Sequence, residues 1–229
     1  MARKKQTETE SENETRILIV DDHPIVRQGL SELINHESDL VVCGQAEDSH
    51  EAIKAVRELN PNMAIIDITL KETSGLELIK DIHAQYPNLP VLALSMHDEN
   101  LYAERSLRAG AMGYIMKQEA TENVIEAVRK ILGGEIYVSE RMAAKMVRKL
   151  VTGQTETSCS QVDSLSDREL EVFSLIGRGH GTRQISERLH LSVKTIETYR
   201  AHIKDKLNLA DAAELRQYAI QWVNTAGDH

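Results

Sequence analysis

The chain has 229 residues with 41% apolar and 3% aromatic side chains, so it is long enough for two domains with aliphatic cores. Its two cysteines, Cys43 and Cys159, are too few for a disulfide framework and lack the spacing of a metal site. We find no signal peptide and no apolar run near about 18 residues, so we expect a soluble, intracellular protein with no membrane partner.

The charge is unevenly divided along the chain. The net charge of −9 at first argues against nucleic acid as a partner. Between residues 16 and 140, however, 11 Lys and Arg stand against 21 Asp and Glu, whereas residues 165–229 contain 9 of each. The excess of acidic residues therefore lies in residues 16–140, and the neutral region at 165–229 can still present a basic face.

Residues 1–15 have no apolar side chain beyond Met1 and Ala2, so we expect a disordered tail. From Arg16 onward, short apolar runs typical of buried strands alternate with amphipathic segments typical of helices. The expected strands span 17–20, 40–45, 63–67, 90–95 and 113–116. Five strands and five helices joined by short loops require parallel pairing with right-handed crossovers. Residues 16–132 should form an α/β flavodoxin-like domain, a parallel five-stranded sheet of order 2-1-3-4-5.

The stretch MAIIDIT ends a buried strand with the carboxylate of Asp67. The carboxyl ends of parallel strands form the ligand-binding edge of an open sheet. Three further strand ends bring the pair Asp21-Asp22, Ser95 and Lys117 to this edge. Clustered carboxylates favour a divalent hard cation such as Mg²⁺. With a lysine and a hydroxyl nearby, Asp67 is equipped to attack phosphorus and form an aspartyl phosphate. Each residue alone is more often a cap, turn or surface residue, but their common placement favours this chemistry.

These residues, with Tyr114 three before the lysine and Gly75 eight after Asp67, resemble the receiver domain of bacterial two-component response regulators over residues 16–132. The resemblance implies that a sensor histidine kinase phosphorylates Asp67. It also implies that Mg²⁺ is held by Asp21, Asp22, Asp67 and the carbonyl of Thr69, and that Ser95, Lys117 and Tyr114 sense the phosphoryl group. The chain departs from the family pattern at Leu70-Lys71, where Met-Pro is common, and at Gln118, where proline is common.

Residues 133–164 are expected to link two domains. Ser139 starts a short amphipathic helix over 139–151, which is too short for a coiled coil and should pack on one domain. Residues 152–164 are rich in Gly, Ser, Thr and Gln and are typical of a flexible linker.

The expected second domain, 165–229, begins with a capping box at Ser166–Glu169, flanked by the hydrophobic staple pair Leu165 and Leu170. Four amphipathic helices follow, and the second and third predict an all-α helix-turn-helix domain with its motif at about residues 183–202. The segments LSDRELEVFSLIGRG and GTRQISERLHLSVKTIETYRAHIKDKLNL resemble the LuxR-type DNA-binding domain. Joined to a receiver, this domain makes the chain similar to the NarL/FixJ family.

The outer face of the third helix should read DNA, although mixed charge is also what an ordinary solvated helix carries. Family members commonly have lysine where this chain has Glu197, and a glutamate can accept a hydrogen bond from cytosine N4. We therefore expect a sequence preference that differs from the common family pattern. The expected DNA-binding residues are Arg183, Lys194, Thr195, Glu197, Thr198, Arg200, Ala201 and Lys204.

The resemblance implies a phosphorylation-dependent transcription factor of the bacterial cytoplasm, not a turnover enzyme. It should bind inverted-repeat sites in double-stranded DNA as a homodimer when active, with RNA polymerase as a further partner. Two alternatives stay open. An aspartyl-phosphate-forming phosphatase is disfavoured because Thr69 stands where such hydrolases commonly have a second carboxylate. A receiver-linked protein-binding adaptor is compatible with Glu197 and the neutral second domain.

Overall fold

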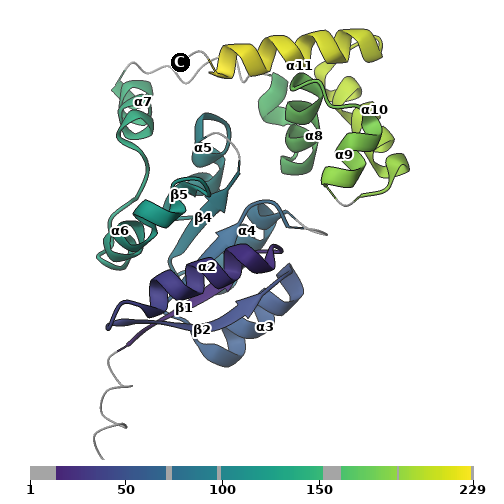
Figure 1. The fold of residues 1–229 in the computed structure, drawn as a ribbon. Helices are drawn as coiled ribbons and strands as arrows, with labels where there is room; N and C mark the ends of the chain where they lie inside the picture. The colour runs from purple at the N-terminus through teal and green to yellow at the C-terminus, as the bar shows by residue number, and fades with distance from the viewer. Residues whose placement is uncertain (1–13, 71–73, 97–98, 152–160, 190, 228–229) are drawn as a thin grey trace, which may run out of the picture. The chain divides into compact units, whose positions relative to one another are not determined.

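The computed structural model describes residues 14–70, 74–96, 99–151, 161–189 and 191–227. The chain divides into two compact units, residues 1–142 and 143–229, and the boundary falls inside the helix at residues 140–151 (Figure 1). None of the helices in these described ranges is long and apolar enough to cross a membrane. Residues 1–13 of the expected tail and residues 152–160 of the expected linker lie outside the described residues.

The first unit is built on a parallel sheet. Its strands are β1 (Thr15–Val20), β2 (Leu40–Ala46), β3 (Met63–Asp67), β4 (Val91–Ser95) and β5 (Gly113–Met116). They lie in the order β2-β1-β3-β4-β5 with parallel pairing throughout, which confirms the predicted topology. All residues of β3 and β4 are buried, as expected for central strands covered on both faces.

One boundary differs from the sequence prediction. Thr15, assigned to the tail, is the first residue of β1 and pairs with Leu40. Its N–H donates to the carbonyl of Asp39 at 2.8 Å. The strand is extended by this backbone hydrogen bond, which does not require an apolar side chain and so leaves no mark in the hydrophobic pattern.

Helices cover both faces of the sheet (Figure 1). They are α2 (Pro24–Asn35), α3 (Ser49–Leu59), α4 (Gly75–Gln85), α5 (Glu99–Ala109) and α6 (Ala120–Leu132). Helices α2 and α6 contact each other on one face, while α3 contacts α4 and α4 contacts α5 on the other. Asp48 is the N-cap of α3, because its carboxylate accepts the Glu51 N–H at 2.8 Å.

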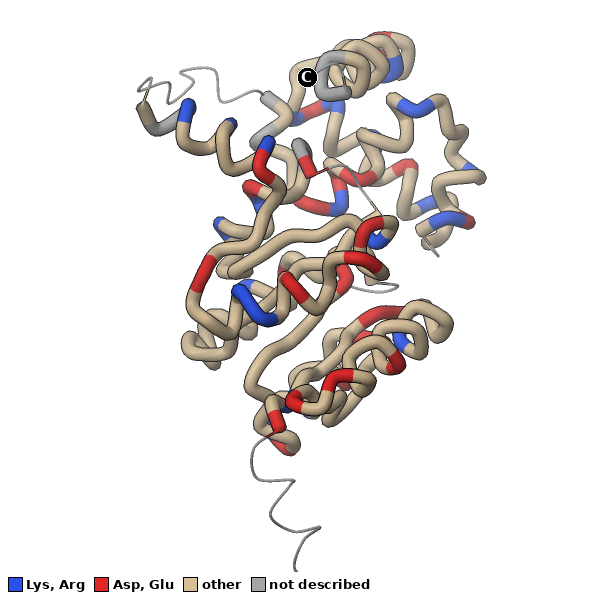
Figure 2. Tube along the Cα trace, turned by 60° about the vertical axis from the view of Figure 1, so that its left-hand side comes forward, with Lys and Arg blue, Asp and Glu red and all other residues tan. Residues whose placement is uncertain are grey.

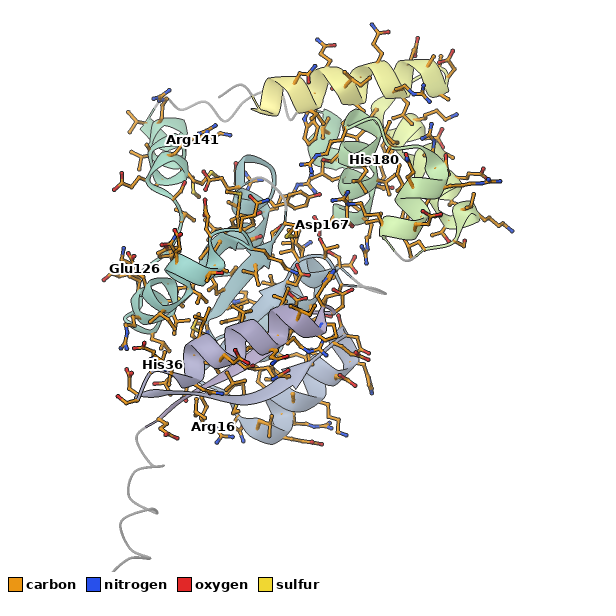
Figure 3. All side chains as sticks on the ribbon, in the orientation of Figure 1. Arg16, His36, Glu126, Arg141, Asp167 and His180 are labelled. Atoms are coloured by element: carbon orange, nitrogen blue, oxygen red, sulfur yellow. The ribbon has the colours of Figure 1, made fainter. Side chains whose placement is uncertain are left out.

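Helix α7 (Glu140–Val151) occupies the position of the predicted linker helix. The Ser139 hydroxyl accepts the Met142 N–H at 3.1 Å, so Ser139 is its N-cap. Met142 is buried, and Arg141 is exposed on the outer face (Figure 3). Val147, further along the same helix, is 58% exposed.

The second unit is helical. After the short 3-10 helix η1 (Gln161–Ser164) come α8 (Asp167–Gly177), α9 (Thr182–Arg188), α10 (Val193–Leu207) and α11 (Ala212–Gly227). The ring of Phe173 on α8 lies 5.8 Å from that of Tyr218 and 5.3 Å from that of Trp222, between ring centres. Phe173 is the only phenylalanine in the chain. It joins α8 to α11 and forms the centre of this small core.

The start of α8 has the predicted capping box. Ser166 N–H donates to Glu169 Oε2 at 2.7 Å, and Glu169 N–H donates back to Ser166 Oγ at 3.4 Å. Glu169 Oε2 also lies 2.6 Å from Lys206 Nζ on α10. Burial would raise the pKa of Glu169, but these partners outweigh burial and lower it. One carboxylate thus caps α8 and links it to α10.

Candidate phosphoacceptor site and nucleic-acid interface

The predicted acidic site forms at the carboxyl edge of the sheet. Asp67 is the last residue of β3 and is 1% exposed, and Asp21 and Asp22, directly after β1, are 0% and 5% exposed. Ser95 ends β4 and Lys117 follows β5. The topology brings these four strand ends to one edge because neighbouring parallel strands end together.

Lys117 joins the carboxylates. Its Nζ lies 2.6 Å from Asp21 Oδ2 and 2.7 Å from Asp67 Oδ2, and its side chain is 6% exposed. Its backbone N–H donates to the carbonyl of Ser95 at 2.7 Å. The Lys117 ammonium is thus fixed against the Asp67 carboxylate, and its backbone is fixed to the strand that carries the Ser95 hydroxyl.

Burial changes the proton affinity of this pair. Burial raises the pKa of Asp67 to about 7, since removal from water outweighs the opposite effect of the Lys117 ammonium, and the Asp21 charge adds to the rise. Burial would lower the pKa of Lys117, but the carboxylates of Asp67 and Asp21 outweigh it and raise this pKa. Lys117 therefore stays charged at neutral pH.

The acidic cluster fits a divalent cation. The side-chain ligand atoms of Asp21, Asp22, His23 and Asp67 all lie within 4.8 Å of one another. Three carboxylates and one ammonium leave a formal excess of two negative charges, which a divalent ion would neutralise. In addition, Asp22 Oδ1 is buried and lies 2.6 Å from His23 Nδ1, but no hydrogen bond of good geometry reaches it from the described residues. Such an oxygen is costly to bury unless something else satisfies it.

His23 is a member of this cluster that the sequence reasoning missed, having treated it only as the residue before helix α2. Its Nδ1 lies 2.6 Å from Asp22 Oδ1 and 3.1 Å from Asp21 Oδ1. Its backbone N–H donates to Asp21 Oδ1 at 2.8 Å. The signal was available, because a histidine directly after two strand-end carboxylates shares their edge of the sheet.

The loop after Asp67 is shaped around its backbone. Thr69 N–H donates to Asp67 Oδ1 at 3.1 Å, which orients the carboxylate. Gly75 N–H donates to the carbonyl of Ile68 at 3.0 Å. A Cβ at Gly75 would stand 1.9 Å from the Asp67 carbonyl oxygen, so only glycine permits this approach. The placement of Thr69 next to the carboxylate agrees with a metal-binding role for its carbonyl, which stays a prediction.

Ser95 and Tyr114 are the two further residues predicted to sense the phosphoryl group. Ser95 is completely buried at the end of β4, and Tyr114 in β5 is 3% exposed. Tyr114 thus faces the interior here. The structure describes one state of the chain, so the roles of Ser95 and Tyr114 in sensing a phosphoryl group stay predictions.

The predicted DNA-binding residues lie mainly on the solvent side of α10. Basic and acidic residues are interspersed along the trace of the second unit (Figure 2). Ile196, Ile203 and Leu207 are buried on the opposite side. Glu197 is exposed, as predicted for a groove-facing residue. Lys194, Thr198 and Ala201 on α10 and Arg183 on α9 are also exposed, whereas Thr195, Arg200 and Lys204 are half-buried.

Three of these side chains also have local partners. Thr198 Oγ1 donates to the Lys194 carbonyl at 3.0 Å, and the Thr195 hydroxyl lies 2.7 Å from the Ser192 hydroxyl at the helix start. Burial and the neighbouring Arg216 lower the pKa of Arg200. Lys194 and Arg183 are therefore the better exposed candidates for phosphate contacts.

Comparison with known proteins identifies the chain. Residues 17–129 match the response regulator receiver domain, and residues 163–219 match the bacterial regulatory proteins of the luxR family. The oxygen regulatory protein NreC of Staphylococcus epidermidis is 37% identical over 211 residues, which cover 90% of this chain and 97% of the relative. The chain belongs to the NarL/FixJ family of two-component response regulators.

Solved structures agree with this assignment. One similar structure is RcsB from Salmonella enterica serovar Typhimurium, bound to a promoter in the presence of the phosphomimetic BeF3−. It has a TM-score of 0.58 and 26% identity, and the match covers 91% of this chain and 100% of the RcsB chain. A structure of two RcsB dimers on two parallel DNAs has a TM-score of 0.54 and 25% identity, with 90% and 98% coverage. The chain is thus a response regulator with a LuxR-type DNA-binding domain and not a turnover enzyme. Membership of this family disfavours both the phosphatase and the adaptor alternatives.

Proposed function

We propose that Asp67 is the phosphoacceptor of this response regulator. The observation that carries the proposal is the Lys117 ammonium, held 2.7 Å from Asp67 Oδ2 in a buried acidic cluster. An Asp67 oxygen forms the bond to phosphorus while the bond from phosphorus to the donor atom breaks. Lys117 then transfers its contact from the carboxylate to the new phosphoryl oxygens, and the Ser95 hydroxyl donates to another of them.

Mg²⁺ fits this site, with Asp21, Asp22, Asp67 and the Thr69 carbonyl as the proposed ligands. When bound there, it would neutralise the oxygens of the transferred phosphoryl group. The support is the excess of negative charge in this buried cluster, whose side-chain ligand atoms, with that of His23, all lie within 4.8 Å of one another.

The test is direct. With Mg²⁺ and a small phosphodonor, the protein should gain one phosphoryl group that is stable in acid and labile in base. Asp67→Asn should remove this labelling, while Asp48→Asn, an exchange of the same type at a helix cap, should retain it. Labelling that persists in the Asp67 variant would overturn the assignment.

We propose that the phosphodonor is a sensor histidine kinase that docks beside the site. A groove of about 730 Å³ lies between α2 and the start of α6, and Lys117 forms part of its wall. Two of its apolar side chains are open to solvent, Ile25 at 85% and Met96 at 54% exposure. Such a surface next to the acceptor suits an apolar face of a partner protein.

Ile25→Glu should slow transfer from a kinase and leave labelling by a small phosphodonor unchanged. Val147→Glu, at a side chain that is 58% exposed on α7, is the matched control. Equal transfer rates for the two variants would show that docking uses another surface.

We propose that the second domain binds double-stranded DNA through the exposed side of α10, and that the active protein is a homodimer on inverted-repeat sites. The RcsB structures, one on a promoter and one with dimers on DNA, support this for a similar protein. Selection of bound DNA from a random pool, with and without beryllofluoride, tests both the sequence of the binding site and the dependence of binding on the phosphorylated state. Single half-sites bound by a monomer would contradict the dimer.

The proposed organisation moves one expected boundary, because Thr15 begins β1. It has a tail at 1–14, a receiver at 15–132, a linker at 133–164 and the DNA-binding domain at 165–229. The proposed location is the bacterial cytoplasm, as for a soluble regulator that meets DNA. RNA polymerase is the proposed further partner of the DNA-bound dimer.

A further inference from the structure

The free edge of β5 is covered by the chain that follows α6. Tyr137 N–H donates to the Met112 carbonyl at 2.9 Å, and Tyr114 N–H donates to the Tyr137 carbonyl at 2.8 Å. Tyr137 also forms a parallel bridge with Gly113. The segment 135–138, predicted as part of a linker, is therefore hydrogen-bonded to the strand that carries Tyr114 and precedes Lys117.

Residues on β5 and on α6 both favour the contact with Tyr137. A Cβ at Gly113 would stand 2.9 Å from the Tyr137 carbonyl oxygen and 2.7 Å from Ile131 Cδ1, so glycine lets the segment approach the strand. Lys130 Nζ lies 5.5 Å from the centre of the Tyr137 ring. These contacts fix the segment to β5 and to α6.

The next residue fixes the start of α7 to a different element. Ser139 Oγ donates to Glu99 Oε1 at 2.7 Å, and the same oxygen accepts the Met142 N–H at 3.1 Å. Glu99 is the first residue of α5, four positions after Ser95 in the chain. One hydroxyl thus caps α7 and binds α5, and the side chain of Met142, in the first turn of α7, is buried.

The start of α7 is consequently attached to two elements of the phosphoacceptor site. β5 ends beside Lys117, and α5 begins shortly after Ser95. A phosphoryl group on Asp67 adds nearly two negative charges. It attracts the Lys117 ammonium and the Ser95 hydroxyl, and these two groups belong to the two different attachments. A displacement of α5 relative to β5 would stretch the single Ser139–Glu99 hydrogen bond first.

We propose that the Ser139–Glu99 hydrogen bond is a latch that holds α7 in the unphosphorylated protein and opens on phosphorylation. The proposal rests on the proposed function, since it needs Asp67 to be the acceptor. The latch lies at the start of the segment that leads to the DNA-binding domain. Its opening frees α7 from the receiver, which makes the DNA-binding domains available for pairing on an inverted repeat.

The test compares Glu99→Ala with Glu104→Ala. Both remove a glutamate from α5, but Glu104 pairs with Arg108 on the helix surface. In Glu99→Ala, amide exchange at residues 140–146 should be raised without beryllofluoride, and DNA affinity without it should increase about tenfold, as expected for loss of one hydrogen bond to a charged acceptor. Glu104→Ala should behave like the wild type.

A second pair tests the Ser139 hydroxyl, which is both the latch donor and the cap of α7, whereas Glu99→Ala removes the latch and leaves the cap. Ser139→Ala should also raise exchange in α7, whereas Ser139→Thr retains the hydroxyl and should restore the wild-type response. All variants should be labelled by a small phosphodonor at the wild-type rate. If the wild type is labelled at Asp67 but Glu99→Ala responds to beryllofluoride as Glu104→Ala does, the latch is wrong and the phosphoacceptor stands. If the wild type is not labelled at Asp67, both proposals fail.

Discussion

Replacement of Gly75 by alanine should damage the phosphoacceptor site without touching an ionisable group. The added Cβ would stand 1.9 Å from the Asp67 carbonyl oxygen and 2.6 Å from Ile68 Cα. Ordinary contacts between such atoms are about 3.5–4.0 Å. The end of β3 and the start of α4 must therefore separate by roughly 1 Å or more, and both sides of the contact are backbone.

The expected cost is about 2–4 kcal/mol in the free energy of unfolding. Overpacking costs about 1–3 kcal/mol. The Gly75 N–H to Ile68 carbonyl hydrogen bond, now 3.0 Å long, is stretched as well, and it is worth about 1 kcal/mol. Because the acceptor is displaced with its backbone, phosphorylation by a small donor should slow by about 100-fold, the loss that follows from a misplacement of about 1 Å.

Gly29→Ala is the matched control. Gly29 lies inside α2 with nothing within 4 Å of an added Cβ. Gly29→Ala should stabilise the protein by about 0.5–1 kcal/mol. It restricts the unfolded chain in the same way as Gly75→Ala does, so this contribution is common to both variants. Urea unfolding and the initial rate of Mg²⁺-dependent labelling measure both quantities. If Gly75→Ala is as stable as Gly29→Ala and is labelled at the same rate, the glycine does not position the acceptor.

The remaining predictions concern three side chains. The pKa of Asp67 is raised from 3.8 to about 7, so folding favours its protonated form. As the pH rises from about 4 to about 7, the metal-free wild type should therefore lose stability relative to Asp67→Asn, by on the order of 4 kcal/mol. Urea unfolding of both proteins in a chelator at several pH values checks the sign, and parallel stability profiles would contradict it. Lys117→Ala should still be labelled, but beryllofluoride should no longer change its DNA affinity; an unchanged response would show that Lys117 does not report the modified state. Glu197→Ala should relax the preference at one base position per half-site by about 1–3 kcal/mol. A uniform gain in affinity for all sequences, measured at two salt concentrations, would instead mean that Glu197 only repels phosphate.

The parts of the site that follow from topology could be predicted from the sequence. Asp67, Ser95 and Lys117 each follow an apolar run, and once those runs are parallel strands their ends must share one edge. Gly75 could be singled out by its distance from Asp67, but only the structure shows that its missing Cβ makes room for the Asp67 carbonyl. The sequence indicates which groups meet, whereas the close approach depends on loop geometry.

The contacts that could not be predicted are those with no periodic signal. The segment 135–138 follows two glycines and has no alternating pattern, so it was assigned to a linker, yet Tyr137 pairs with β5 through backbone groups that every residue possesses. His23 is a different case, since its position directly after Asp21-Asp22 indicated the edge of the sheet, and only the direction of its side chain needed the structure. Ser139 was recognised as a helix start, and its second partner, Glu99, lies 40 positions away.

The link between Glu169 and Lys206 bears on how DNA binding is controlled. The 2.6 Å ion pair and the capping box hold α10 against α8 when no DNA is present. The reading helix is therefore preorganised, and little of the binding free energy is used to order it. Control by phosphorylation then has no folding step to act on in this domain. Phosphorylation has to act on the positions that two already folded DNA-binding domains can reach. The strength of the response should therefore depend on linker length and geometry more than on the stability of the helix-turn-helix.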